Sequence, residues 1–191
     1  MRESVRLDLM RHGETKGGSG FVGCTNYPLS ERGWEQMWLS VEGRDGWKQI
    51  VTSPLSRCTD FAYALSRHYA TPVRIEDRFS EINFGAWEGR TARQVMLTQA
   101  EALNRYWYNP VQYTPPDGES LTMFASRVLS AWSDILAEQQ SDNTLIIAHG
   151  GVIRVILCHV WQHPLQRLLD FDVRYSEINS IYVENIKSGS S

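Results

Sequence analysis

Apolar positions along the chain repeat with two different spacings. Val5, Leu7 and Leu9 recur at every second residue, which predicts a strand that runs directly into Arg11 and His12. Other short apolar runs predict further strands, and apolar residues three or four positions apart predict helices. The predicted strands cover residues 4–11, 49–53, 72–78, 143–149 and 180–186, and the predicted helices cover residues 31–43, 54–70, 91–107, 121–140 and 152–161.

This alternation of strands and helices predicts the fold class. It favours an α/β domain of three layers, α/β/α, in which helices cover both faces of a mainly parallel sheet. Ser30 and Ser53 are predicted to cap the first two helices, with Pro54 in the first turn of the second. We expect one domain over residues 1–187, a lid-like insertion at about 82–120, which includes a proline-rich loop, and a disordered tail over 188–191.

Composition narrows the class of protein. The chain has 191 residues, of which 42% are hydrophobic and 21% are charged, so it can bury the core of one compact domain. The formal net charge of -3 argues against a surface that binds nucleic acid or anionic lipid, because both require a concentrated basic field. No signal peptide or membrane span is recognisable, and the three cysteines fit neither a disulfide framework nor a zinc site. We therefore expect a cytoplasmic protein.

Unusual side chains follow three of the predicted strands. Arg11 and His12 end the first strand, Arg57 lies shortly after the second, and His149 ends the strand at 143–149. In open α/β sheets ligands bind outside the carboxyl ends of the strands, so these residues are expected to meet in one pocket. The arginines suit phosphate oxygens, and a neutral His12 can attack phosphorus. The pattern predicts a phosphate site with a histidine nucleophile.

Four short blocks resemble one known family in the same order. "LMRHGET", "SPLSRC", "EINFGAWEG" and "IIAHGG" are similar to blocks of the histidine phosphatase superfamily, also called phosphoglycerate-mutase-like. The resemblance spans roughly residues 5–160. It implies that His12 becomes phosphorylated, that Arg11, Arg57 and His149 hold the phosphoryl oxygens, and that Glu81 is the proton donor. It implies no metal and no organic cofactor.

Two details of the site go beyond that pattern. Glu81 can donate a proton near neutral pH only if its pKa is raised, which burial beside apolar neighbours favours and a positive pocket opposes. Where the family often has a tryptophan and an asparagine, this chain has "KGGSG", so backbone amides of Gly17, Gly18 or Ser19 are candidates to replace the asparagine contact, and no residue within Gly17–Thr25 is singled out. Gly150 follows His149, where acid phosphatases of the family have an aspartate, so the chain resembles the mutase-like branch.

The same blocks leave several substrates open. Mutases of this family carry added segments that keep water out, so hydrolysis is expected of this shorter chain. "RFSEINFGAWEGRTARQV" and "AHGGVIRVIL" are similar to the α-ribazole phosphatases of cobalamin biosynthesis, which implies a small phosphomonoester, α-ribazole 5'-phosphate or adenosylcobalamin 5'-phosphate, as substrate. A broad-specificity sugar-phosphate phosphatase and a phosphoglycerate mutase are the alternatives. A phosphoprotein phosphatase and a non-catalytic binding module fit less well.

Aromatic residues in the predicted lid are candidates for substrate contact. Tyr106, Trp107, Tyr108 and Tyr113 could stack on a flat base, or could simply anchor the lid to the core. A homodimer, paired through the helix that carries Trp161 and through the C-terminal strand, is a further expectation.

Overall fold

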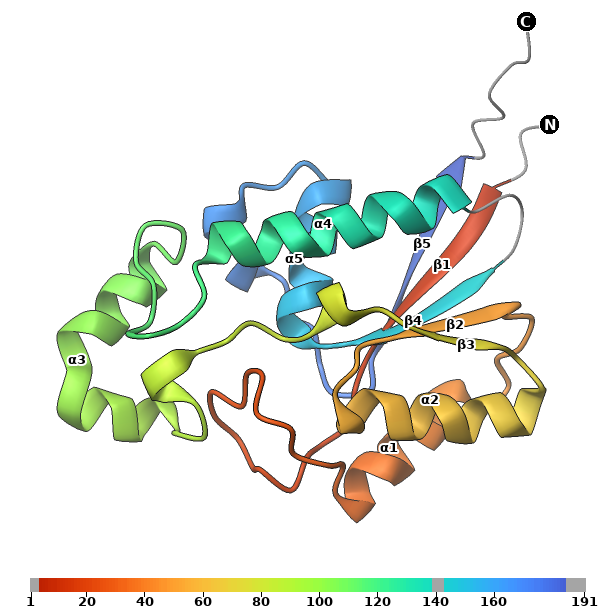
Figure 1. The fold of residues 1–191 in the computed structure, drawn as a ribbon, viewed down its shortest axis with the longest axis horizontal. Coiled ribbons are helices and arrows are strands. Elements are labelled where there is room, and N and C mark those ends of the chain that lie inside the picture. The colour runs from red at the N-terminus through yellow and green to blue at the C-terminus, as the bar shows by residue number, and fades with distance from the viewer. Residues whose placement is uncertain (1–3, 139–142, 185–191) are drawn as a thin grey trace, which may run out of the picture.

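Five strands of the described chain form one twisted sheet at the centre of the molecule (Figure 1). The computed structural model describes residues 4–138 and 143–184. The strands are β1 (Ser4–Arg11), β2 (Gln49–Thr52), β3 (Val73–Ile75), β4 (Thr144–Ala148) and β5 (Ile178–Glu184), in the order β3-β2-β4-β1-β5. All neighbours are parallel except β1 and β5, which are antiparallel. The predicted α/β class and mainly parallel sheet are confirmed.

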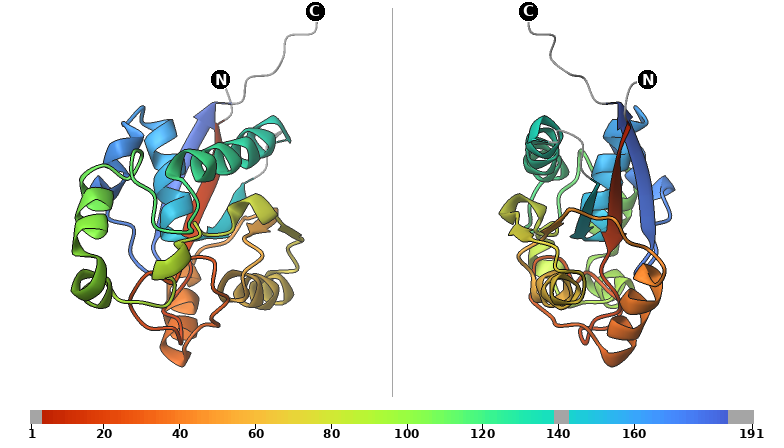
Figure 2. Two further views of the ribbon diagram at one scale, coloured as in Figure 1. Left: turned by 60° about the vertical axis from the view of Figure 1, so that its left-hand side comes forward. Right: turned by 90° about the vertical axis from the view of Figure 1, so that its right-hand side faces the viewer.

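Helices cover both faces of this sheet (Figure 2). The α-helices are α1 (Glu31–Val41), α2 (Ser56–Tyr69), α3 (Ala92–Tyr108), α4 (Leu121–Glu138) and α5 (Gly150–Val160), and the 3-10 helices are η1 (Asp77–Phe79), η2 (Gly85–Trp87) and η3 (Leu165–Asp170). Along β4, Ile146 packs in the core under α4 and α5, whereas Leu145 and Ile147 pack in the core under α1 and α2. Every residue of β4 is buried, as expected for a central parallel strand.

The two predicted helix caps have different outcomes. Ser30 caps α1 as predicted, since its hydroxyl accepts a hydrogen bond from the Gly33 amide at 3.0 Å. Ser53 does not cap α2, because that helix begins only at Ser56, and Pro54 therefore lies before the helix. The Ser56 amide instead donates to Asn26 Oδ1 at 2.8 Å.

Residues 82–120 form a separate layer beside the sheet. In Figure 1 α3 stands at the left, away from the strands. A small core of its own, built on Trp87, Val95 and Leu103, holds α3 against η2. The helix is kinked at Gln99, whose side-chain oxygen accepts a hydrogen bond from Trp87 Nε1 at 2.8 Å. These residues form a small hydrophobic cluster next to the main core, and the lid-like insertion at about 82–120 stays a prediction.

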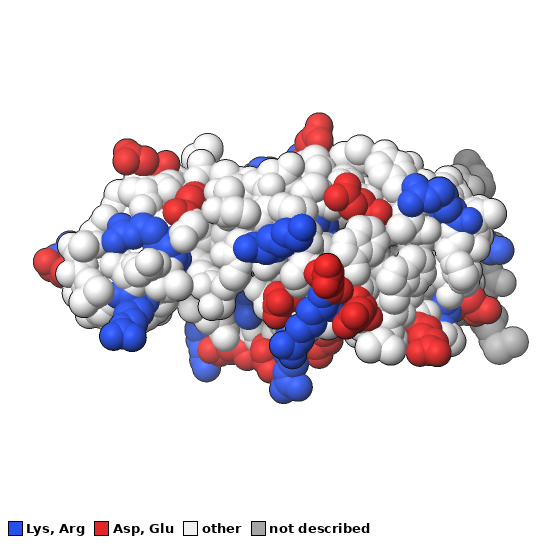
Figure 3. Space-filling model, turned by 90° about the horizontal axis from the view of Figure 1, so that it is seen from below, with Lys and Arg blue, Asp and Glu red and all other residues white. Residues whose placement is uncertain are grey.

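Charged side chains of both signs are mixed on the surface. Figure 3 shows cationic and anionic side chains interspersed on the face seen from below, with no single basic field. Within the described ranges no helix is long and apolar enough to cross a bilayer. Trp161 is 56% exposed at the end of α5, and the dimer expected there stays a prediction. The tail predicted at 188–191 and the last residues of the strand predicted at 180–186 lie outside the described residues.

Candidate active site

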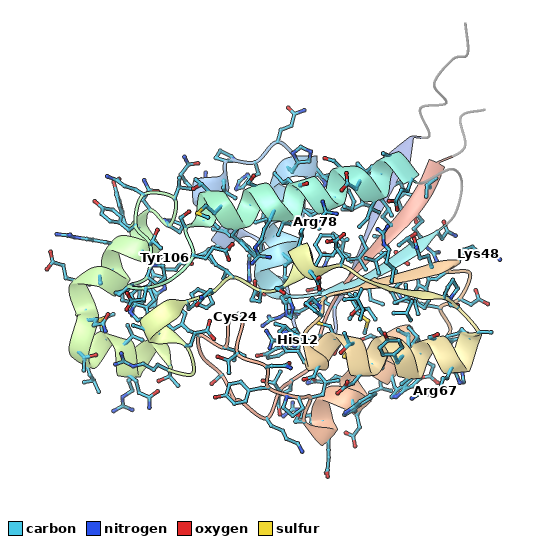
Figure 4. All side chains as sticks on the ribbon, viewed as in Figure 1. His12, Cys24, Lys48, Arg67, Arg78 and Tyr106 are labelled. Atoms are coloured by element: carbon cyan, nitrogen blue, oxygen red, sulfur yellow. The ribbon has the colours of Figure 1, made fainter. Side chains whose placement is uncertain are left out.

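A cavity of about 240 Å³ opens beside the carboxyl end of β1. Of the residues predicted from sequence, Arg11, His12, Arg57, Glu81 and Tyr106 line it. The apolar part of its wall is formed mainly by Phe21, Ile82, Phe84, Leu121, Phe124 and Leu168. Figure 4 shows Tyr106 on α3 at the left and His12 nearer the middle, where it follows the end of β1. The insertion therefore supplies one wall of a pocket whose floor comes from the sheet.

His12 is held as a neutral ring with one free nitrogen. Its Nδ1 lies 2.7 Å from the Gly13 carbonyl oxygen, and because a carbonyl only accepts, Nδ1 carries the proton. Nε2 is then the unprotonated nitrogen. Burial lowers the pKa of His12 well below its usual value, and the charges of Arg57 and Arg11 lower it further, although the Gly13 carbonyl opposes them. A neutral ring with a free Nε2 is the form that can act as a nucleophile.

His149 lies behind His12, with ring centroids 5.1 Å apart. It is fully buried at the N-cap of α5, directly after β4. Arg57 Nε donates to its Nδ1 at 3.2 Å, so its own proton is on Nε2, which donates to Ser53 Oγ at 2.6 Å. Burial, followed by the charge of Arg57, holds the pKa of His149 well below the usual histidine value. Both ring nitrogens therefore have protein partners, and to contact a phosphoryl oxygen through Nε2 the ring would have to release Ser53.

Arg57 connects His149 to the segment of residues 20–25, hereafter the 20–25 loop. Besides its bond to His149, Arg57 donates from Nη1 to the Thr25 carbonyl at 2.7 Å and from Nη2 to the Gly23 carbonyl at 2.5 Å. A guanidinium carries about five N–H groups, so further donors stay available for an anion. The loop contributes Gly20, Phe21, Val22 and Gly23 to the cavity wall, whereas the candidates Gly17, Gly18 and Ser19 do not line it.

Arg11 has donors that no protein group uses. Its Nη1 donates to the Val173 carbonyl at 2.7 Å, and its guanidinium lies 4.0 Å from the centre of the Tyr175 ring. Its buried Nε has no hydrogen-bond partner within the described part of the chain. A buried, unsatisfied cationic donor in a cavity is costly, and an anion in the cavity would satisfy it.

Glu81 is held at the N-terminus of α5. Its Oε2 accepts from the Gly151 amide and its Oε1 from the Ile82 amide, each at 3.0 Å. Gly151 is needed there, because a Cβ on it would lie 2.3 Å from Glu81 Oε1. The carboxyl group lines the cavity together with Arg11 and His12, as the sequence predicted.

Arg154 is a cavity residue that the sequence analysis missed. Its Nε donates to the Phe171 carbonyl at 2.9 Å, and burial, with a contribution from Arg11, lowers its pKa. No carboxylate of the described residues forms an ion pair with it. The signal was present, since Arg154 lies four positions after Gly150 on the helix that follows His149, and residues four apart share a helix face.

The four lid aromatics separate in space. Tyr106 lines the cavity and packs edge-on against Trp87, with ring centroids 5.5 Å apart. Trp107 is 44% exposed and Tyr108 is 86% exposed, and neither lines the cavity. Tyr113 also lies outside the cavity wall, with the Arg105 guanidinium 5.8 Å from its ring centre. Only Tyr106 is placed to contact a molecule in the cavity.

Comparison with known proteins places this geometry in a family. The model of the histidine phosphatase superfamily (branch 1) matches residues 7–188. The chain belongs to the histidine phosphatase superfamily. The chain is 33% identical over 158 residues to a bifunctional protein of Mycobacterium tuberculosis, and the match covers 80% of this chain but only 43% of that protein.

Two relatives that are named as phosphatases are also similar. A glucosyl-3-phosphoglycerate phosphatase of Mycolicibacterium vanbaalenii is 32% identical over 162 residues, covering 79% of this chain and 72% of the relative. An adenosylcobalamin/alpha-ribazole phosphatase of Escherichia coli is 29% identical over 175 residues, covering 88% and 85%. The crystal structure of a putative alpha-ribazole-5'-P phosphatase from E. coli superposes with a TM-score of 0.86 at 26% identity, over 95% of this chain and 92% of that one. The resemblance predicted from the four blocks is thereby confirmed.

Proposed function

We propose that the protein is a phosphomonoesterase that works through a phosphohistidine at His12. The observation that carries this proposal is the state of His12, a buried neutral ring whose Nδ1 donates to Gly13 and whose Nε2 is free, beside Arg11 and Arg57. A nucleophile without a proton to lose, next to fixed cations, is suited to attack on a phosphoryl group.

In the first step the lone pair of His12 Nε2 forms a bond to phosphorus as the bond from phosphorus to the ester oxygen breaks. The leaving oxygen takes a proton from Glu81, so the alcohol departs neutral. Arg11 and Arg57 stabilise the charge on the equatorial phosphoryl oxygens. His149 holds the Nε of Arg57 during this step.

In the second step water attacks phosphorus of phospho-His12. Glu81, now a carboxylate, accepts a proton from the water, and the P–N bond breaks with its electron pair returning to Nε2. Inorganic phosphate leaves and both residues are restored. All the proton and electron transfers involve side chains of the cavity, and no step uses a metal.

For the substrate we propose α-ribazole 5'-phosphate or adenosylcobalamin 5'-phosphate, within cobalamin biosynthesis. The similarity to alpha-ribazole phosphatases over most of the chain supports this choice. The cavity adds a physical argument, because Phe21, Phe84 and Tyr106 give it aromatic walls on the side of the insertion. A flat base attached to the ribose would find ring contacts there.

Arg154 favours a second candidate, a phosphatase for esters whose alcohol carries an acidic group. It is a cavity cation that forms no ion pair with a carboxylate of the described residues, and burial, followed by the charge of Arg11, lowers its pKa. It lines the cavity together with Glu81, the proposed proton donor to the leaving alcohol. A carboxylate on that alcohol would pair with it, which suits the glucosyl-3-phosphoglycerate phosphatase relative.

The test is steady-state phosphate release in the presence of EDTA. α-Ribazole 5'-phosphate, 3-phosphoglycerate, fructose 2,6-bisphosphate and p-nitrophenyl phosphate are compared, with His12→Ala and Arg154→Gln alongside. A preference of several hundredfold in kcat/KM for ribazole phosphate, about 3.5 kcal/mol of transition-state binding, supports the cobalamin assignment. A preference for 3-phosphoglycerate that Arg154→Gln removes supports the second candidate.

Two outcomes would count against the proposal. A flat profile that His12→Ala abolishes keeps the mechanism and rejects both substrate assignments. Full activity in His12→Ala rejects the phosphohistidine mechanism itself.

A further inference from the structure

Two charged side chains, Arg57 and Glu88, hold the 20–25 loop through hydrogen bonds. Arg57 on α2 binds the carbonyls of Gly23 and Thr25, at 2.5 and 2.7 Å. Glu88, directly after η2, binds amides of the same loop, with the Cys24 amide 3.0 Å from Oε1 and the Thr25 amide 2.9 Å from Oε2. The Thr25 hydroxyl also donates to Glu88 Oε2. Arg57 thus binds the carbonyls and Glu88 the amides of one short segment, residues 23–25.

Glu88 also ties this loop to the insertion. Its Oε1 accepts a further hydrogen bond from the Phe84 amide at 2.8 Å, so the carboxyl group accepts four hydrogen bonds in all. Within the described residues no Lys, Arg or His forms an ion pair with it. Glu88 therefore acts only as an acceptor that joins two segments, and both of them line the cavity.

The backbone at Gly23 leaves room for the Glu88 carboxylate. Gly23 has a φ of 51°, in the left-handed region, and a Cβ on it would lie 1.8 Å from Glu88 Oε1. A side chain at position 23 would displace the carboxyl group. The close approach also places the Gly23 carbonyl at Arg57 Nη2.

A continuous chain of hydrogen bonds leads from Glu88 to the floor of the cavity. Glu88 holds the 20–25 loop, the loop carbonyls hold both terminal nitrogens of Arg57, and Arg57 Nε donates to His149. Without the loop carbonyls the guanidinium would lose the two bonds that fix its rotation. Its remaining N–H groups would then no longer be aimed by the fold.

We infer that Glu88 is a positioning residue, which sets the orientation of Arg57 toward the phosphoryl group by fixing the 20–25 loop. Glu88 does not touch the reacting atoms. The inference rests on the proposed function only for the identity of the anion, because the contacts themselves define an anion site at Arg57. This role of Glu88, the acidic residue of "GAWEG", differs from that of Glu81, the proposed proton donor.

The experiment measures the binding of inorganic phosphate by titration calorimetry, which does not depend on turnover. Glu88→Gln keeps the size of the side chain but replaces one acceptor oxygen with an NH₂ group, which cannot accept from the Thr25 amide. We expect it to weaken phosphate binding about tenfold and to lower kcat/KM for p-nitrophenyl phosphate by a similar factor. Glu101→Gln, an exposed carboxylate on α3, is the matched control and is expected to change neither.

A double-mutant cycle separates positioning from a general loss of structure. If Glu88 acts through Arg57, Glu88→Gln costs less than about threefold in an Arg57→Lys background, where the loop no longer aligns a guanidinium. Equal losses in both backgrounds, or unchanged phosphate binding in Glu88→Gln, overturn the inference. Should Glu88→Gln fail to fold, Thr25→Val removes one of its partners and is read in the same two backgrounds. Failure of the proposed function would appear separately, as hydrolysis that survives in His12→Ala.

Discussion

At the scale of single residues, the site depends on two histidines that stay neutral. Burial is the largest cause of the lowered pKa of both His12 and His149, and Arg57 is the next. A guanidinium beside a nucleophile usually serves the substrate, but here it also keeps the nucleophile unprotonated before substrate arrives. Arg57 also fixes the tautomer of His149, because its Nε donates to Nδ1 and leaves the ring proton on Nε2, where Ser53 Oγ accepts it.

This arrangement predicts the dependence of stability on pH. The pKa values of His12 and His149 are lowered in the folded state, so the unfolded chain binds more protons as the pH falls through about 6.5. The free energy of unfolding in phosphate-free buffer is therefore expected to fall by about 2.5 kcal/mol between pH 7.5 and 5.5 from these two groups. Urea unfolding at both values measures it, with His12→Gln expected to remove about half of the difference. An equal difference in His12→Gln would show that His12 is not the source.

Tyr106 is the lid aromatic whose replacement should affect substrate choice. Tyr106→Ala is expected to lower kcat/KM for α-ribazole 5'-phosphate about fivefold more than for p-nitrophenyl phosphate, because the larger leaving group loses a ring contact. Trp107→Ala is the control, since Trp107 does not line the cavity. Equal losses on both substrates would remove the stacking role of Tyr106.

At the scale of elements, the start of α5 brings the chemistry together. The helix begins at Gly150, directly after His149, and its second residue, Gly151, donates its amide to Glu81. The positive end of the helix dipole lies at this point and favours a bound anion. The strand β4 and helix α5 thus deliver one histidine and hold one carboxyl group within a few residues.

Gly151→Ala tests this element. The new Cβ would push Glu81 Oε1 away and would lie 3.2 Å from Phe124 Cζ. We expect kcat/KM for an alkyl phosphate to fall about a hundredfold but to fall much less for p-nitrophenyl phosphate, whose leaving group needs little help from an acid. Thermal unfolding checks that the fold persists. The same loss for both esters would argue against Glu81 as the proton donor.

The helices and strands could be predicted from the sequence, whereas their ends and the contacts of several side chains could not. Period-two spacing, short apolar runs and helical spacing located every strand and α-helix of the described chain. Ser53 was misread as a cap because local rules cannot detect that its hydroxyl binds His149, 96 positions away. Arg154 was missed because an arginine on a helix is usually solvated. Glu88 was missed because its four donors come from segments distant in sequence or from backbone amides.

At the scale of the whole molecule, the cavity has an excess of positive charge although the chain as a whole does not. The chain is formally -3, yet the cavity is lined by Arg11, Arg57 and Arg154 against the one carboxylate of Glu81. Buried cations without counter-ions destabilise the empty fold. A phosphomonoester dianion would neutralise the excess positive charge of the cavity, so a bound anion should also stabilise the folded state.

Inorganic phosphate is therefore expected to stabilise the protein against heat. At about 100 times its Kd, phosphate should add about 2.7 kcal/mol, which raises Tm by roughly 5–10 °C for a domain of this size. Scanning calorimetry in phosphate and in chloride of equal ionic strength measures this, and Arg57→Gln is expected to lose most of the shift. A rise of the same size in Arg57→Gln would place the anion elsewhere.

The separate core of the insertion has a consequence for how such a protein diversifies. Trp87, Val95 and Leu103 form a cluster distinct from the main core, joined by Phe21 of the 20–25 loop and by Phe84, which also packs against the main core. Substitutions around Tyr106 can therefore reshape the wall facing the leaving alcohol while the strand that carries His12 keeps its packing. Evolution can therefore change the preferred substrate and keep the nucleophile, because the cavity wall around Tyr106 and the strand that carries His12 pack in different hydrophobic clusters.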